Sequence, residues 1–186
     1  CNGGVSIMSE LRTNRIVPRD GLPSGASGGG IIQVVQNVVT SSSTGTGATP
    51  ASVMTCSITP TSSANKILVM VDTNVGSSNG YNTVAYLYRG TGGSGTKIYF
   101  GDADGSRPRV ARSATAYQNA NTTYNQIPLQ IHYLDSPSST SQITYDLRLA
   151  SYSTILWSFN RSYANQNTSE YDGVNASSIT LMEVCG

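Results

Sequence analysis

The chain has little charge. Only 11% of its 186 residues are Asp, Glu, Lys or Arg, against about 25% in an ordinary globular protein. The net charge is +1, which gives no broad field that would attract the chain to nucleic acid or to a membrane surface. The polar surface must therefore come from Ser, Thr, Asn, Gln and Tyr, a composition that suits a protein exposed to the outside.

Long apolar segments are also missing. The sequence contains no run of about 18 apolar residues, so no transmembrane helix is predicted. It does not open with a charged and then apolar leader, so no secretory signal is predicted either. Met8 is a candidate translation start, which would make residues 1–7 an upstream extension.

Cysteine is scarce and widely spaced. The chain has Cys1, Cys56 and Cys185. An odd number at these spacings matches neither a disulfide framework nor a paired zinc motif. Cys56 and Cys185 both lie in apolar runs of β character, so we expect them to be small hydrophobic residues of a core.

The first part of the chain has no pattern for packing on itself. Residues 1–30 are predicted to form an extended N-terminal anchoring arm with a Gly-rich linker, since Pro18 and Pro23 exclude a continuous helix. An extended peptide of this kind can join the edge of a partner's sheet, with arginines pairing to carboxylates. A disordered tail is the alternative. The expected partner-binding residues of the arm are Leu11, Arg12, Arg15, Ile16, Val17 and Arg19.

Residues 31–186 are predicted to form an all-β head domain. Short β-branched and apolar runs alternate with Ser, Thr, Asn and Gly clusters, and no helical period is present, which predicts an antiparallel β-sandwich or jelly-roll-like head. The expected strands lie within residues 31–39, 52–58, 66–75, 82–90, 97–100, 127–135, 142–150, 155–159 and 178–184.

The pattern inside these runs predicts which side chains face the core. The unbroken apolar residues 67–71 predict a strand buried on both faces. A later run alternates cleanly, which places Tyr145 inside and Asp146 outside. Trp157 and Phe159 share one face of their run and are expected at the centre of the core.

Several stretches of the chain are similar to known sequences. LRTNRIVPRDGLPSGASGGGIIQVVQ resembles the N-terminal region of small virion proteins of tailed bacteriophages, especially those of cyanobacterial and marine hosts. ITPTSSANKILVMV, IHYLDSPSSTSQITYDLRLAS and ITLMEV resemble the β-head of the same proteins. The insert DADGSRPRVARS and the residues before Met8 depart from that pattern.

The resemblance implies a non-enzymatic component of the external surface of a phage particle. It implies a homotrimer with a jelly-roll-like head, either a capsid cement (decoration) protein bound to the major capsid protein or a tail or baseplate fibre that contacts the host. The shortness of the chain favours cement, whereas the recurrence of such heads in fibres favours the alternative. A fibre head could also bind host surface glycans. The resemblance supplies no catalytic residue and no cofactor.

Two glycine-rich matches to catalytic motifs lack the context that the chemistry needs. GASGG, at 25–29, has the spacing of a nucleophile elbow but follows Pro23 and precedes a strand. GTGGSG, at 90–95, has the spacing of a dinucleotide-binding loop but joins two runs of β character, which predicts a hairpin.

The segment from Asp102 onward has two interpretations. Asp102 and Asp104 begin like a calcium loop, but the later ligands are missing and arginines follow. We therefore expect no metal there and interpret the segment as a solvated loop with internal ion pairs or as a contact patch at a subunit boundary. The candidate outer-surface contacts are Asp102, Asp104, Arg107, Arg109, Tyr163 and Tyr171.

His132 is the only histidine of the chain and is the one candidate for a hydrolytic centre. It lies on the polar face of its run. Catalysis would require a nucleophile beside it and an orienting acid such as Asp135 or Asp146. A surface or interface histidine is the simpler interpretation, and no catalytic residue is predicted.

Overall fold

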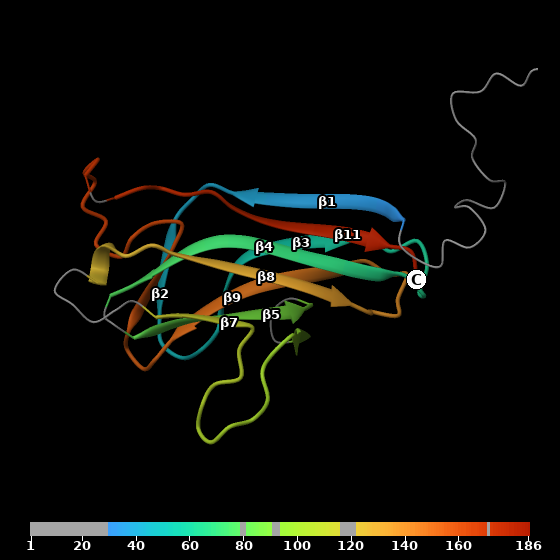
Figure 1. Ribbon diagram of the computed structural model, residues 1–186, viewed down its shortest axis with the longest axis horizontal. Helices are drawn as coiled ribbons and strands as arrows, with labels where there is room; N and C mark the ends of the chain where they lie inside the picture. Colours follow the sequence, from blue (N-terminus) through green and yellow to red (C-terminus); the bar gives the residue numbers. More distant parts are fainter. Residues whose placement is uncertain (1–29, 79–80, 91–93, 116–121, 171) are drawn as a thin grey trace, which may run out of the picture.

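The computed structural model describes residues 30–78, 81–90, 94–115, 122–170 and 172–186 (Figure 1). The arm predicted at residues 1–30 lies outside this part of the chain except for Gly30. The described residues form two antiparallel sheets and one short 3-10 turn at Thr122–Tyr124. Within them, no helix has the length and hydropathy needed to span a bilayer.

One sheet has six strands and the other has five. The six-stranded sheet contains β1 (Ile31–Val39), β2 (Ser43–Thr46), β4 (Lys66–Ser77), β8 (Ile127–Asp135), β10 (Leu156–Phe159) and β11 (Ser177–Val184). The five-stranded sheet contains β3 (Ala51–Ile58), β5 (Asn82–Arg89), β6 (Thr96–Ile98), β7 (Arg112–Thr115) and β9 (Ile143–Ser151).

The strand order is that of a jelly roll. In the six-stranded sheet the order is β1-β11-β4, with β8 also paired to β4, and in the five-stranded sheet it is β3-β9-β5, with β6 and β7 also paired to β5. The chain therefore passes back and forth between the sheets, from β1 to β3, β4, β5, β8, β9 and β11. This alternation is the double-sheet arrangement of jelly rolls, and it confirms the predicted fold class of the head.

The core lies between the two sheets. Tyr145 and Leu147 of the five-stranded sheet are fully buried, as are Ile131 and Leu181 of the six-stranded sheet. Trp157 and Phe159 are also buried, which confirms the prediction for both. Aliphatic burial on this scale supplies most of the stabilisation of a small sandwich.

The prediction that residues 67–71 are buried on both faces is wrong. Ile67, Val69 and Val71 face the core and are buried, whereas Leu68 and Met70 lie half-buried on the outer face of the six-stranded sheet. Strand alternation turns every second residue outward, so an unbroken apolar run leaves two large side chains at this surface.

Asp146 lies on the outer face of β9 as predicted, yet it is only 1% exposed. Its carboxylate accepts hydrogen bonds from Ser52 Oγ at 2.6 Å and from Arg148 Nε at 2.7 Å. The Arg148 guanidinium also lies 3.9 Å from the centre of the Tyr88 ring. An outward position is therefore compatible with burial when a neighbouring arginine covers it.

Among the other local predictions, those for the GTGGSG hairpin and for Cys56 are confirmed, whereas Cys185, expected in the core, is not part of it. β5 and β6 pair antiparallel, with Leu87 opposite Ile98, so the GTGGSG segment joins a hairpin as expected, although its residues 91–93 lie outside the described chain. Cys56 is buried, and burial raises the pKa of its thiol. Cys185 is half-buried, and its N–H donates to the Gly30 carbonyl at 3.0 Å. The place where the arm enters the head therefore lies beside the end of β11.

Candidate interaction surfaces

The outer face of the six-stranded sheet carries a row of apolar side chains. Val34 of β1 lies opposite Met182 of β11, Met182 opposite Leu68 of β4, and Leu68 opposite Leu134 of β8. Val34 is 54% exposed and Leu134 is 46% exposed. We call these four residues the apolar row. It crosses β1, β11, β4 and β8 without a polar interruption.

A mostly polar row, interrupted by Met70, borders the apolar row on one side. In the next row Gln36 donates from Nε2 to Thr180 Oγ1 at 2.8 Å, and Met70 and His132 continue the line. An exposed apolar strip with polar neighbours is typical of a protein–protein contact surface. The row is therefore the strongest candidate for such a contact among the described residues.

β1 forms an open edge of the same sheet. It pairs with β11 on one side, and no described strand pairs with its other side. Its nine residues contain no charge and no proline, the two features that usually protect edge strands. The unpaired N–H and C=O groups of β1 are thus available to another extended segment.

Side chains on the inner side of β1 hold this edge against the opposite sheet. Gln33 Nε2 donates to the Thr59 carbonyl at 2.8 Å, and Asn37 Nδ2 donates to the Thr55 carbonyl at 2.8 Å. Thr55 belongs to β3, the neighbouring edge of the five-stranded sheet. Because both amides are engaged inward, the edge is fixed in position before any partner binds.

Glu183 anchors the same corner from inside. It is fully buried, and its Oε1 accepts from Asn65 Nδ2 at 2.6 Å and from Thr61 N and Oγ1 at 2.7 and 2.8 Å. Its Oε2 accepts from Gln33 Nε2 at 2.6 Å. Burial raises the pKa of Glu183, but the hydrogen bonds from Asn65, Gln33 and Thr61 outweigh burial and lower that pKa to about 2.

The outer face of the five-stranded sheet differs in character, because aromatic rings and cations are stacked on it. Lys97 Nζ lies 5.4 Å from the centre of the Tyr86 ring and 4.9 Å from that of Phe100, and the Arg109 guanidinium lies 4.4 Å from the Phe100 ring. Lys97 Nζ also donates to the Arg109 carbonyl at 3.0 Å. These contacts attach the base of the β6–β7 loop, residues 99–111, to the sheet, while the loop itself extends away from the sandwich (Figure 1).

A cavity of about 390 Å³ opens beside this loop. Tyr81 and Tyr152 stand at its margin with ring centres 5.8 Å apart and ring planes inclined by 21°. None of the residues that line the cavity carries a charge. They are Ala48, Tyr81, Asn82, Val84, Tyr86, Ser106, Pro108, Ala150, Ser151 and Tyr152.

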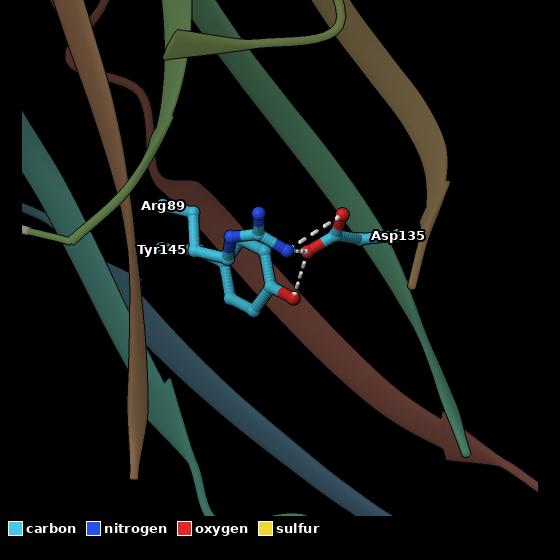
Figure 2. Close-up of polar contacts among 3 residues, drawn as sticks. All are labelled: Arg89, Asp135 and Tyr145. Carbon is cyan, nitrogen blue, oxygen red and sulfur yellow. Dashed lines mark hydrogen bonds and ion pairs between the residues drawn. The ribbon is translucent and has the colours of Figure 1, made fainter. Parts of the chain in front are cut away.

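Three buried or half-buried polar side chains join the sheets at one end of the sandwich (Figure 2). Asp135 closes β8, and its Oδ2 accepts a hydrogen bond from Tyr145 Oη at 2.7 Å and pairs with Arg89 Nη1 at 3.1 Å. Burial, followed by the hydrogen bond to Asp135, raises the pKa of Tyr145. The carboxylate is engaged by both partners, so the group acts as a clamp between the sheets.

The sequence-predicted outer-surface residues do not form one site. Asp102, Asp104, Arg107 and Arg109 all lie in the exposed β6–β7 loop, where Asp104 pairs with Arg107 and Arg109 Nε donates to the Gly101 carbonyl at 2.7 Å. The internal ion pair predicted for this loop is therefore confirmed.

Tyr163 is half-buried in the segment between β10 and β11 and thus belongs to another part of the molecule. Tyr171 lies outside the described residues, as do the arm residues Leu11, Arg12, Arg15, Ile16, Val17 and Arg19. Their predicted contacts stay predictions.

His132 is exposed on the outer face of β8. Asp135 lies three positions later and faces the opposite side of the same strand, where it joins Tyr145. Asp146 belongs to the other sheet. Neither acid predicted as a partner for His132 shares its face. Among the described residues, no group of three or more His, Cys, Asp and Glu side chains could hold a metal ion.

Sequence reasoning missed the apolar row and the tyrosine pair. The residues of each come from strands far apart in the chain, and only the register between those strands brings them together. Leu68 and Leu134 were visible as apolar residues, but nothing in the sequence pairs β4 with β8 at that register.

Comparison with solved structures gives distant similarities. No protein-family model matches the sequence, and no curated protein matches it. The chain is similar to a chain in the structure of infectious bursal disease virus, Gx strain, with 10% sequence identity and a TM-score of 0.35. The similarity covers 83% of this chain and 40% of that chain. At that TM-score it carries no argument, so the function proposed below rests on the residues.

Proposed function

We propose that this chain is a non-enzymatic structural protein on the external surface of a phage particle, a homotrimeric capsid cement protein. Its N-terminal arm anchors it to the major capsid protein, and its jelly-roll head associates with two further copies and projects outward. The trimer and the phage particle come from the sequence resemblance. Jelly rolls also build viral capsid domains, although a fold by itself does not fix a function.

The observation that carries the proposal is the apolar row together with the open β1 edge. An apolar strip across four strands is unfavourable at the surface of a single copy, because burying each exposed aliphatic side chain would contribute about 1.5–3 kcal/mol. Association with another copy removes that strip from water. Such a surface is what a protein that assembles with other copies requires.

The point of entry of the arm supports the same role. Gly30 immediately precedes β1 and lies against Cys185 at the end of β11. The described chain thus begins at Gly30, beside the end of β11 and at the start of the open β1 edge. A Gly-rich linker at this position can direct an extended peptide either along that edge or across to a neighbouring subunit.

Light scattering of the purified chain tests the proposal. We expect a particle of three times the 19.6 kDa chain mass. Leu134→Lys places a charge in the apolar row and should give monomers, while Gln142→Lys adds the same charge at an exposed position near the start of β9 and should leave trimers. A wild-type monomer at every concentration, or a Leu134→Lys protein that stays trimeric, would contradict the assembly role.

The second candidate function is the head of a tail or baseplate fibre that contacts the host surface. The specific observation in its favour is the uncharged, tyrosine-lined cavity on the five-stranded sheet, which faces away from the apolar row. A particle map separates the two candidates, because cement density lies on the capsid lattice and fibre density lies on the tail.

A further inference from the structure

We propose that the cavity beside the β6–β7 loop binds a neutral pyranose, stacked on the Tyr81–Tyr152 pair. The site lies on the outer face of the five-stranded sheet and does not depend on assembly through the apolar row. It goes beyond the cement role and would supply the contact with a glycan that a fibre head requires.

The tyrosine pair is positioned by neighbouring strands. Thr83 of β5 lies opposite Ser151 of β9, so Tyr81 and Tyr152 leave the ends of paired strands side by side. Tyr152 is 68% exposed and Tyr81 is 43% exposed. The two rings are stacked on each other, so the sugar would lie on the free face of the more exposed Tyr152 ring, and a tyrosine presents such a surface at low conformational cost. The C–H face of a pyranose matches it in size and polarity.

The floor of the cavity is apolar and buried. Val84, Tyr86 and Ala150 form a small buried cluster of their own, separate from the main core. Burial raises the pKa of the Tyr86 hydroxyl, as does the nearby Tyr88. A floor that is formed without ligand requires little rearrangement when a ligand enters.

Polar groups stand around this apolar floor. Asn82 accepts a hydrogen bond from Thr115 Oγ1 through Oδ1, and its carbonyl accepts from Ser151 Oγ at 2.9 Å. Asn82 lines the cavity, where its Nδ2 would donate to a ligand hydroxyl. Ser106 adds a hydroxyl from the β6–β7 loop. An apolar platform with a few such groups is the usual form of a small-ligand site.

The chemistry of the lining selects a neutral ligand. No Asp, Glu, Lys or Arg lines the cavity, so a phosphate, a sialic acid or a charged peptide would find no countercharge there. A purely apolar ligand would leave the amide and hydroxyl groups without partners, at a cost of about 1–3 kcal/mol for each group that becomes buried. A neutral sugar satisfies both the rings and the polar groups.

Saturation-transfer NMR on the full chain tests this site. The probes are the methyl β-glycosides of glucose, galactose, mannose and N-acetylglucosamine, each added to wild-type protein. We expect transfer to the ring protons of at least one glycoside, with a dissociation constant in the range of about 1 mM that suits a single sugar. Absence of transfer to every probe would overturn the proposal.

Variants at Tyr152 localise the binding. Tyr152→Ala removes the platform and should weaken binding at least about tenfold, which corresponds to about 1.4 kcal/mol. Tyr152→Phe keeps the ring and should bind nearly as wild type. Because the side chain is largely exposed, neither change should unfold the head. Wild-type affinity in Tyr152→Ala would contradict stacking on this ring. So would a loss of affinity in Tyr152→Phe as large as that in Tyr152→Ala.

Leu134→Lys serves as the matched control on the opposite face. It should abolish trimers while leaving sugar binding intact, so failure of the assembly proposal and failure of the glycan site give different results. Loss of sugar binding in Leu134→Lys, at full folding, would show that the cavity is not the site.

Discussion

Tyr145 donates a hydrogen bond to Asp135 across the interior of the sandwich, from β9 in one sheet to the last residue of β8 in the other. Arg89 of β5 completes the group from the side (Figure 2). Apolar contacts hold two sheets together without specifying how they are aligned. A directional contact at one end fixes that alignment, and with it the position of each outer face.

Removal of the Asp135 carboxylate should therefore be costly. Asp135→Ala leaves a buried tyrosine hydroxyl and a partly buried guanidinium without their acceptor, and we expect the free energy of unfolding to fall by about 2–3 kcal/mol. Urea denaturation followed by fluorescence measures this loss. Asp104→Ala breaks the exposed ion pair with Arg107 and should change the stability by less than about 1 kcal/mol. Equal losses in the two variants would contradict the clamp.

Acid should weaken the corner beneath β1. The pKa of Glu183 is lowered from 4.5 to about 2, so its hydrogen bonds contribute stability that is fully present above about pH 4.5. This contribution is lost as the pH falls from 4.5 toward 2, because Glu183 takes up a proton in the unfolded chain before it does so in the folded protein. Melting temperatures measured across this range should fall for wild type.

Glu183→Gln is the variant that isolates this effect. It cannot ionise, so its melting temperature should be lower than that of wild type at pH 7, and the gap between the two proteins should narrow below pH 4.5. A gap that stays constant across the whole range would mean that Glu183 does not carry the pH dependence.

Because Gly45 lies close against Trp157, a larger residue at this position should destabilise the head. A Cβ at Gly45 would collide with Cζ2 and the neighbouring atoms of the buried indole. Since the surrounding core is packed, we expect Gly45→Ala to cost about 1–3 kcal/mol. Thermal denaturation gives the comparison with Gly101→Ala, where a Cβ meets no atom within 4 Å. The Gly101→Ala variant should have the melting temperature of wild type. A Gly45→Ala variant with that same melting temperature would contradict the close packing of Gly45 against Trp157.

Deletion of residues 1–29 tests the anchoring role of the arm. All of the described strands follow this segment, so the shortened chain should fold and form trimers by light scattering. It should no longer join particles in an incorporation assay, since the anchor is gone. A shortened chain that incorporates at normal occupancy would contradict anchoring by the arm.

The sequence was sufficient for the longer strands and for the core because both depend on local alternation. It missed β2 and β7, two four-residue strands in segments that carry no alternating apolar pattern. Tyr145, Trp157 and Phe159 fall on the apolar side of their own strands, and no knowledge of neighbours is needed to place them. The same reasoning failed at residues 67–71, where an unbroken apolar run was taken to mean burial on both sides. Leu68 and Met70, two of its five residues, instead lie half-buried on the outer face of the sheet.

The candidate surfaces depend on pairing between distant strands. Val34 and Leu134 are 100 positions apart and reach one row only through β11 and β4. Tyr81 and Tyr152 meet for a similar reason. Such partnerships follow from the three-dimensional register, which a single sequence without aligned relatives does not contain.

The hydrogen bond from Cys185 N–H to the Gly30 carbonyl has a practical consequence. Because the two ends of the jelly roll meet, a few residues inserted between Gly186 and Gly30 would close the domain into a ring, and a new start could be opened in the protruding segment around Gly105. Such a permuted protein should keep its fold. The arm would then be a separate peptide, so arm and head could be added separately and mixed at chosen ratios.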